Sequence, residues 1–236
     1  MNRQNKDTPH SSQKAVSLRR SAGIFKLTAC LLFPVLSSCI GVSADITIAA
    51  GGSGKIALEY RVSRMAEALG RLDGNERRQT VPVGRADFER FLARLPDMRL
   101  VSFSAREQAA GGAANGGDII NRAELEFKNI DALLAFLDFS GQRASFVRQN
   151  GTNRLTLTLL EAREPADSDL LALVRELSLD YELRLSLSAE GTASLRLKPE
   201  TVPSARLVSP GKKVSFTIPT GELLSLPGGL ELEFAW

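Results

Sequence analysis

The sequence predicts an α+β fold, in which an antiparallel sheet of hairpins carries short helices packed on one face. Two observations predict it. Runs of alternating apolar and polar residues recur along the chain, separated by glycine-rich or Asn-Gly turns, as in paired strands. Between these runs, apolar residues recur at i, i+3, i+4 and i+7, the spacing of a helix with one buried face. We therefore expect hairpin-and-helix units that share one sheet.

The first predicted unit is a hairpin followed by a helix. Strands over Asp45–Ala50 and Lys55–Ser63 flank the turn Gly51-Gly52-Ser53-Gly54. Apolar residues alternate along the second strand, which indicates that one face of the hairpin is buried. A short helix is expected at Arg64–Leu69.

The same glycine-rich turn, together with Lys55, resembles a phosphate-binding loop. Such a loop needs a glycine where Ala49 stands and a serine or threonine where Ile56 stands, because that hydroxyl is a magnesium ligand. We therefore interpret the segment as a hairpin turn.

A helix and a second hairpin follow. The apolar stripe predicts a helix over Arg85–Leu95, which Pro96 ends. Strands over Met98–Ser104 and Ile119–Phe127 flank a loop at 109–118 that is rich in glycine and alanine.

The pattern recurs in the middle of the chain. An apolar stripe predicts a helix over Ile130–Leu137. Strands over Arg143–Gln149 and Arg154–Leu160 form a hairpin over Asn150-Gly151, a turn dipeptide that favours tight hairpins. A third stripe predicts a helix over Ser168–Leu177.

The last third of the chain is rich in strands. Its alternating apolar positions run from Tyr181 to Leu187, over Leu195 and Leu197, from Val214 to Ile218, and from Leu230 to Trp236. Prolines mark irregular connections between these runs rather than a clear boundary. We therefore expect one α+β domain over 45–236, with a β-rich C-terminal subdomain at 180–236 as the alternative.

The N-terminal region has the order of an export signal. Arg19, Arg20 and Lys26 supply positive charge, and Leu27–Val35 is a short apolar run. The motif Leu36-Ser37-Ser38-Cys39 follows directly. A cysteine in this place resembles the lipobox of bacterial lipoproteins.

The lipobox resemblance implies that residues 1–38 are removed and that the Cys39 thiol carries acyl chains such as palmitate. Leu36, Ser37 and Ser38 would be recognised by the signal peptidase, which cuts before Cys39. Residues 39–44 are then a lipid-anchored linker. The partner is a membrane, either the cell membrane or the outer membrane, with the domain facing the periplasm or the cell exterior. The alternative is an ordinary secretory signal or membrane anchor that contains a cysteine by chance.

Processing changes the charge and the reactive side chains of the protein. Segment 1–38 holds six of the 30 basic and one of the 27 acidic residues, so the mature chain has 24 basic and 26 acidic residues. Nucleic-acid binding is therefore not expected. The leader also holds the only histidine, His10, and one of the two cysteines, Cys30. Cys39 alone remains, so we expect no disulfide, no Cys/His metal site, no cofactor and no histidine-based enzyme.

The hairpin from Asp45 to Ser63, soon after a lipobox, resembles the opening of LppM-type lipoprotein domains, and the strand ending in Trp236 is similar to their closing strand. The glycine-rich loop at 109–117 and the longer helical middle depart from that family. The resemblance implies an exported, lipid-anchored α+β domain with a binding or host-interaction role. It implies no catalytic residues.

Phe136 and Phe139 lie off the main Ile130–Leu137 stripe, so we interpret them as candidates for a ligand groove, with core packing as the alternative. The predicted function is a lipid-anchored envelope lipoprotein whose domain binds a lipid or an envelope protein without catalysis. A structural or envelope-assembly lipoprotein that acts through a protein partner is the alternative. A carboxylate-based or Ser-Lys enzyme is the third hypothesis.

Overall fold

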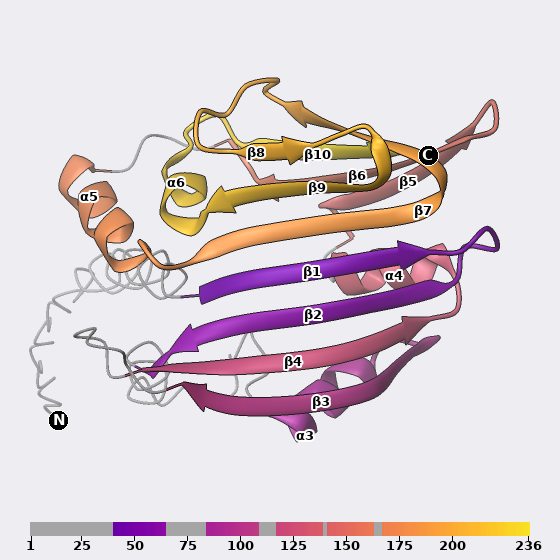
Figure 1. Ribbon diagram of the computed structural model, residues 1–236, viewed down its shortest axis with the longest axis horizontal. Coiled ribbons are helices and arrows are strands. Elements are labelled where there is room, and N and C mark those ends of the chain that lie inside the picture. Colours follow the sequence, from indigo (N-terminus) through magenta and orange to yellow (C-terminus); the bar gives the residue numbers. More distant parts are fainter. Residues whose placement is uncertain (1–39, 65–83, 109–116, 139–140, 163–166) are drawn as a thin grey trace, which may run out of the picture. The chain divides into compact units, whose positions relative to one another are not determined.

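The computed structural model describes residues 40–64, 84–108, 117–138, 141–162 and 167–236. These residues are mostly β, and their ten strands form one curled, mixed sheet accompanied by four short helices (Figure 1). Within the described part of the chain, no helix has the length and apolar character needed to cross a membrane. The helix predicted at 64–69 and most of the loop predicted at 109–118 lie outside the described residues.

Eight strands follow one another in the order β3-β4-β2-β1-β7-β10-β6-β5, while β9 pairs with β7 and β8 pairs with β9. The bounds are β1 Ile40–Ile48, β2 Gly54–Ser63, β3 Met98–Gln108, β4 Asp118–Phe127, β5 Ala144–Gln149, β6 Thr152–Leu160, β7 Glu182–Lys198, β8 Arg206–Val208, β9 Gly211–Pro219 and β10 Leu230–Ala235. Most of these strands were predicted from alternation, whereas the short β8 was not.

The predicted hairpins are confirmed. The turn between β1 and β2 is closed by a hydrogen bond from the Ala49 amide to the Ser53 carbonyl at 2.8 Å. Between β5 and β6, Asn150 and Gly151 adopt φ values of 53° and 75°. Positive φ at both turn residues matches the right-handed twist of the flanking strands, which is why Asn-Gly suits a two-residue hairpin.

The prediction of an entirely antiparallel sheet is wrong, because β7 runs parallel to β1. The first part of β7 lies between β1 and β9, and its last part, from Ser194, pairs with β10. Pairing with β9 is irregular between Ser188 and Ala193, where Gly191 has φ +89°. One strand of 17 residues therefore replaces the two separate alternating runs that the sequence indicated. Parallel neighbours need a long crossover, and no local pattern marks one.

The predicted linker at 39–44 is also wrong, since β1 begins at Ile40. Residues 40–44 pair with β2, from Ile40 opposite Val62 to Ala44 opposite Leu58. Val42 and the residues after it pair with β7 as well. Pairing on both sides makes this segment an interior part of the sheet.

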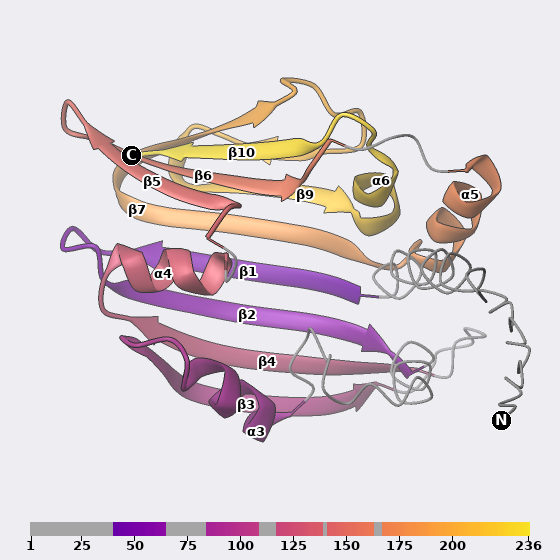
Figure 2. The same ribbon diagram turned by 180° about the vertical axis from the view of Figure 1, so that it is seen from behind.

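The helices are α3 Arg85–Leu92, α4 Ile130–Leu137, α5 Ser168–Leu177 and α6 Thr220–Ser225. Both views place α3 and α4 on the same face of the β1–β4 part of the sheet (Figures 1 and 2). Asn129 caps α4 by accepting a hydrogen bond from the Ala132 amide at 2.8 Å. The first three helices match predicted stripes, but α6 has only six residues and gave no detectable stripe.

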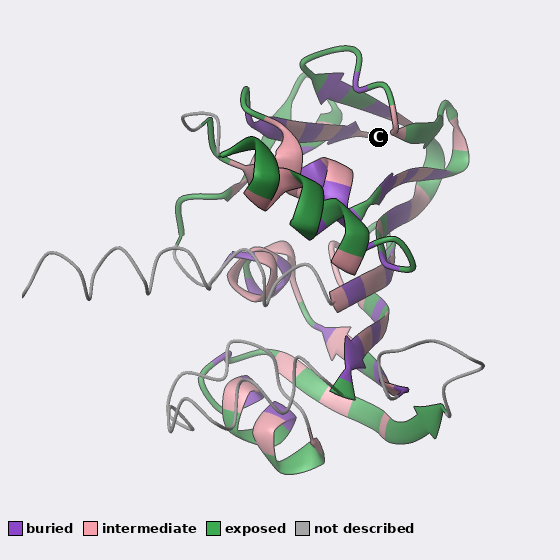
Figure 3. Cartoon of the chain, turned by 90° about the vertical axis from the view of Figure 1, so that its left-hand side faces the viewer, coloured by how far each residue is buried: buried purple, intermediate pink, exposed green. Residues whose placement is uncertain are grey.

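Burial alternates along the strands, as Figure 3 shows. On β1, Ala44, Ile46 and Ile48 are buried, while the residues between them are half-buried or exposed. Phe88 of α3 packs between the rings of Tyr60 and Phe103, at 6.1 and 5.6 Å between ring centroids. The buried apolar residues form one cluster that includes strands from β1 to β10. The opposite face of β1–β4 carries polar and charged side chains, as expected for a sheet with one wet face.

Candidate functional site

A groove of about 970 Å³ lies across five neighbouring strands, in the order β3, β4, β2, β1 and β7, at one end of the first four and at the middle of β7. With strands about 4.8 Å apart, the groove spans roughly 19 Å of sheet width. Its lining comes from three successive rows of residues, of which the first two cross all five strands and the third lies mostly in the turns beside them. The site is therefore built by strand register rather than by one loop.

The outer row is polar and lies on the face of the sheet opposite to α3 and α4. Ser188 is paired with Thr47, Thr47 with Lys55, Lys55 with Glu126, and Glu126 with Arg99. Side chains directly opposite each other on one face lie within contact distance. The row places Glu126 between two cations.

The second row is apolar. It consists of Ala189, Ile48, Gly54, Phe127 and Met98, again paired in sequence across the five strands. Ile48 and Phe127 are buried, and Met98 and Ala189 are half-buried. This row gives the groove an apolar floor at the edge of the hydrophobic core.

Gly54 is required by a close approach of backbone. A Cβ atom at this position would lie 2.0 Å from the Thr47 carbonyl oxygen and 2.5 Å from the Phe127 ring. Only glycine fits between these two groups. Glycine at the first position of β2 therefore permits both the hairpin and the position of the groove floor.

The third row lies in the turns and connections next to β1–β4, except for one member that lies within β7. Its members are Glu190, Ala49, Ser53, Lys128 and Asp97. The Lys128 Nζ atom donates to Asp97 at 2.9 Å, and the Lys128 side chain is 78% exposed. Because this row is open to solvent, its charges form a rim around the apolar floor.

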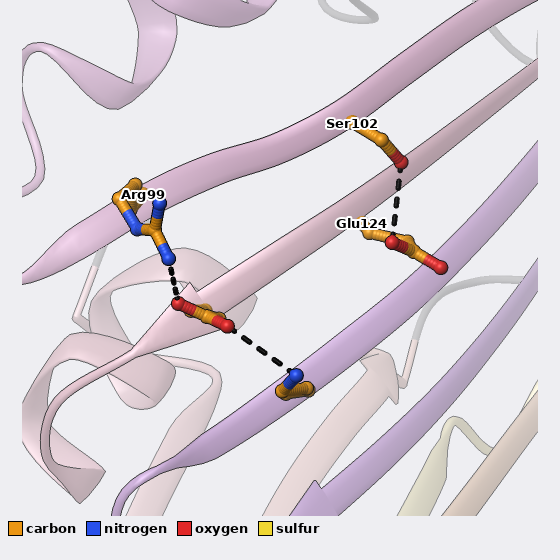
Figure 4. A network of polar contacts seen from close by, with 5 residues as sticks. Arg99, Ser102 and Glu124 are labelled. Atoms are coloured by element: carbon orange, nitrogen blue, oxygen red, sulfur yellow. Dashed lines mark hydrogen bonds and ion pairs between the residues drawn. The ribbon is translucent and has the colours of Figure 1, made fainter.

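Glu126 accepts hydrogen bonds from both cations beside it, and Figure 4 shows the side chain of one of them, Arg99, with its contact. Arg99 makes the first contact, and the Lys55 Nζ atom lies 3.4 Å from the other carboxylate oxygen. Figure 4 also shows the neighbouring contact from Ser102 to Glu124, at 3.3 Å. The hydrogen bonds from Arg99 and Lys55 lower the pKa of Glu126.

Asp97 is held in the same way on the rim. Hydrogen bonds from Lys128 and then Asn129 lower the pKa of this carboxyl group. Both rim carboxylates therefore stay ionised at neutral pH. In total the lining has three cations, Lys55, Arg99 and Lys128, against three anions, Asp97, Glu126 and Glu190. The groove combines an apolar floor with a charge-balanced rim.

No cluster of three or more His, Cys, Asp or Glu side chains that could hold a metal ion occurs in the described part of the chain. The chain matches no protein-family model and no curated protein. The resemblance to LppM-type domains thus stays a prediction.

Of the site residues expected from the sequence, only Phe136 belongs to the described residues, and it does not line this groove. Phe136 lies on α4, where its ring meets that of Phe91 edge-on at 6.0 Å between centroids. Its ring is half-buried and packs against the core cluster. Phe139, Cys39 and the segment 36–38 lie outside the described residues.

Sequence reasoning missed the groove, although it identified one part of it. The turn before Lys55 was correctly interpreted as a hairpin turn rather than a phosphate loop, and Ser53, Gly54 and Lys55 do line the groove. The remaining lining comes from strands that are distant in sequence. Only a correct register for all five strands could have located the site.

Proposed function

We propose that this chain is a lipid-anchored lipoprotein of the bacterial cell envelope whose α+β domain binds an amphipathic ligand without transforming it. The observation that carries the binding proposal is the groove, with its apolar row beneath a charge-balanced rim. The lipobox at 36–39 supports the anchoring. The two parts are independent and are tested separately.

The chemistry of the groove favours an amphipathic ligand. Met98 and Ala189, the half-buried apolar side chains of the lining, can bury more surface against an acyl chain or another apolar group, at about 25 cal/mol per Å² of apolar surface. Lys55, Arg99 and Lys128 suit an anionic group, and the rim carboxylates suit a cationic one. A zwitterionic headgroup attached to an apolar tail satisfies all three requirements.

Binding without catalysis agrees with the state of the rim carboxylates. Asp97 and Glu126 both have lowered pKa values because cations donate hydrogen bonds to them. A general acid at neutral pH needs a raised pKa instead. These side chains are suited to binding charged groups.

The groove is tested by a matched pair of substitutions in one turn. Ala49 lines the groove, whereas the equally exposed Ala50 does not. Ala49→Arg should weaken binding of dodecylphosphocholine, titrated as monomer and followed by calorimetry, at least tenfold. Ala50→Arg should bind like the parent protein. Equal affinity of all three proteins would exclude this groove as the site.

The anchor is tested by Cys39→Ala in cells fed an alkyne fatty acid. The parent protein should acquire the label, and the variant should remain unlabelled with its leader attached. Equal labelling of both proteins would contradict acylation at Cys39.

The second candidate function is envelope assembly through a protein partner. Strand β3 ends the sheet order, and none of its eleven residues is classed as buried. Unpaired edge strands accept a strand from another protein through backbone hydrogen bonds. Recovery of one stoichiometric partner from mild detergent, lost on Ser104→Pro in β3, would favour this function.

A further inference from the structure

The sheet begins directly after the proposed lipid anchor. Ile40 is the first residue of β1 and pairs with Val62. Its carbonyl oxygen also accepts a hydrogen bond from the Thr220 hydroxyl at 3.3 Å. Consecutive Cα atoms are about 3.8 Å apart, so Cys39 lies within one residue of a fixed point in the sheet. Acyl chains on Cys39 would bring this end of the domain against the bilayer.

Two exposed leucines lie at the same end. Leu179 is 77% exposed and Leu173 is 45% exposed. Leu179 stands two residues before Tyr181, whose ring is in van der Waals reach of Gly41 in β1. Leu173 belongs to α5, which Figures 1 and 2 both place beyond the start of β1 and β7. Apolar side chains beside an acyl anchor gain by entering the headgroup region.

Three described arginines at this end pair with carboxylates of the same protein. Arg61 lies 2.6 Å from Asp118, Arg64 pairs with Glu107, and Arg175 lies 3.4 Å from Glu222. Paired arginines offer little attraction to anionic headgroups. Contact with the bilayer should therefore depend on the leucines more than on these three arginines.

The groove lies at the other end of the same strand. β1 runs nine residues from Ile40 to Ile48, and Ile48 lies in the groove floor. At about 3.3 Å per residue, the groove is roughly 26 Å from the anchored end. A strand fixed at one end and carrying the site at the other acts as a rigid spacer.

We propose that the domain stands on the membrane on its Ile40 end, with Leu173 and Leu179 in the headgroup region, and presents the groove about 26 Å away from the anchoring leaflet. This rests on the proposed acylation of Cys39. It deepens the proposed function, because the groove then takes a ligand that has left the anchoring leaflet or comes from elsewhere in the envelope.

The test uses the full-length lipoprotein, purified from bacteria and reconstituted in vesicles of phosphatidylethanolamine and phosphatidylglycerol. Acylation blocks Cys39, so an introduced cysteine is the only reactive thiol of the mature chain. Leu179→Cys reports on the Ile40 end, and Ala50→Cys reports on the groove end. Each is labelled with a bimane fluorophore, and nitroxide-headgroup lipid is added as the quencher.

We expect several-fold stronger quenching at position 179 than at position 50. Leu173→Ser should reduce the quenching at position 179 while leaving the acylated mass unchanged. Equal quenching at both positions, or stronger quenching at position 50, would overturn the proposed orientation. Mass spectrometry of the same samples separates the two claims, since an unacylated Cys39 would overturn the anchoring itself.

Discussion

The two ends of the β1–β2 hairpin hold their charged side chains in different ways. At the Ile40 end, Asp118 is only 14% exposed and accepts hydrogen bonds from Arg61 at 2.6 Å and from the Tyr181 hydroxyl at 2.8 Å. At the groove end, the side chains of Lys55 and Arg99 are 73% and 69% exposed around Glu126.

This difference suggests how one sheet serves two purposes. Asp118 joins β4 to β2 and to the residue that precedes β7, so the Ile40 end is fixed by a partly buried polar cluster. Exposed ion pairs contribute little to stability, so those at the groove can open around a ligand at small cost. The charged side chains at the Ile40 end are held by partly buried hydrogen bonds. Those at the groove end are exposed and can exchange one ion-pair partner for another.

We expect the largest loss of stability from a substitution at the groove end that displaces the backbone rather than one that removes a charge. Gly54→Ala forces a Cβ atom against the Thr47 carbonyl oxygen, at 2.0 Å before any shift. We expect a loss of about 3 kcal/mol in the free energy of unfolding, measured by urea denaturation. Gly51→Ala is the control, since a Cβ there would meet nothing within 4 Å. Equal stability of the two variants would contradict this account of the turn.

At the Ile40 end, Asp118→Ala should cost about 2 kcal/mol, because it leaves the partly buried Arg61 and the Tyr181 hydroxyl without their shared acceptor. Glu59→Ala is the matched control, since it breaks an exposed pair with Arg122 on the same face of the sheet. That control should cost less than about 1 kcal/mol. Equal losses in the free energy of unfolding for Asp118→Ala and Glu59→Ala would contradict the proposed difference between partly buried and exposed ion pairs.

A smaller, pH-dependent effect is expected at Asp45, midway along β1. Burial raises the pKa of this carboxyl, but hydrogen bonds from Lys213, at 2.6 Å, and from Ser186 outweigh it, so the pKa is lowered. A lowered pKa adds stability above the unfolded value of 3.8, and this stability is lost as the pH falls through the folded value.

Lys213→Ala should therefore destabilise the protein at pH 7, and the loss should shrink below about pH 4. Lys212→Ala, in the same strand, is the control. Urea denaturation at several pH values measures both variants. A loss from Lys213→Ala that is the same at pH 7 and pH 3 would contradict the role of Asp45.

Local patterns predicted most of the fold. Alternation located the hairpins, the Asn150-Gly151 dipeptide located a turn, and the stripe at Ser168–Leu177 matched α5 at both ends. These features depend on residues that are close in sequence. The parallel pairing of β1 with β7 depends on residues about 140 positions apart, as between Val42 and Leu183, and no local pattern encodes it.

The same limit explains the errors near Ile40 and the missed groove. Residues 39–44 were interpreted as linker because they follow the lipobox, yet pairing with β2 from Ile40, and with β7 from Val42, makes 40–44 part of a strand. Glu126 looks like any surface carboxylate until register places it between Lys55 and Arg99. Phe136 was predicted to line a ligand groove because it lies off its helical stripe. Its ring instead packs edge-on against the ring of Phe91 in α3.

Native mass spectrometry of residues 40–236, exported with a cleavable signal and purified without detergent, tests the binding proposal most directly. The account predicts a co-purified amphiphile that organic extraction removes, that Ala49→Arg abolishes and that Ala50→Arg retains. A ligand-free mass for the unaltered domain would contradict the groove as an amphiphile site and would favour assembly through a protein partner.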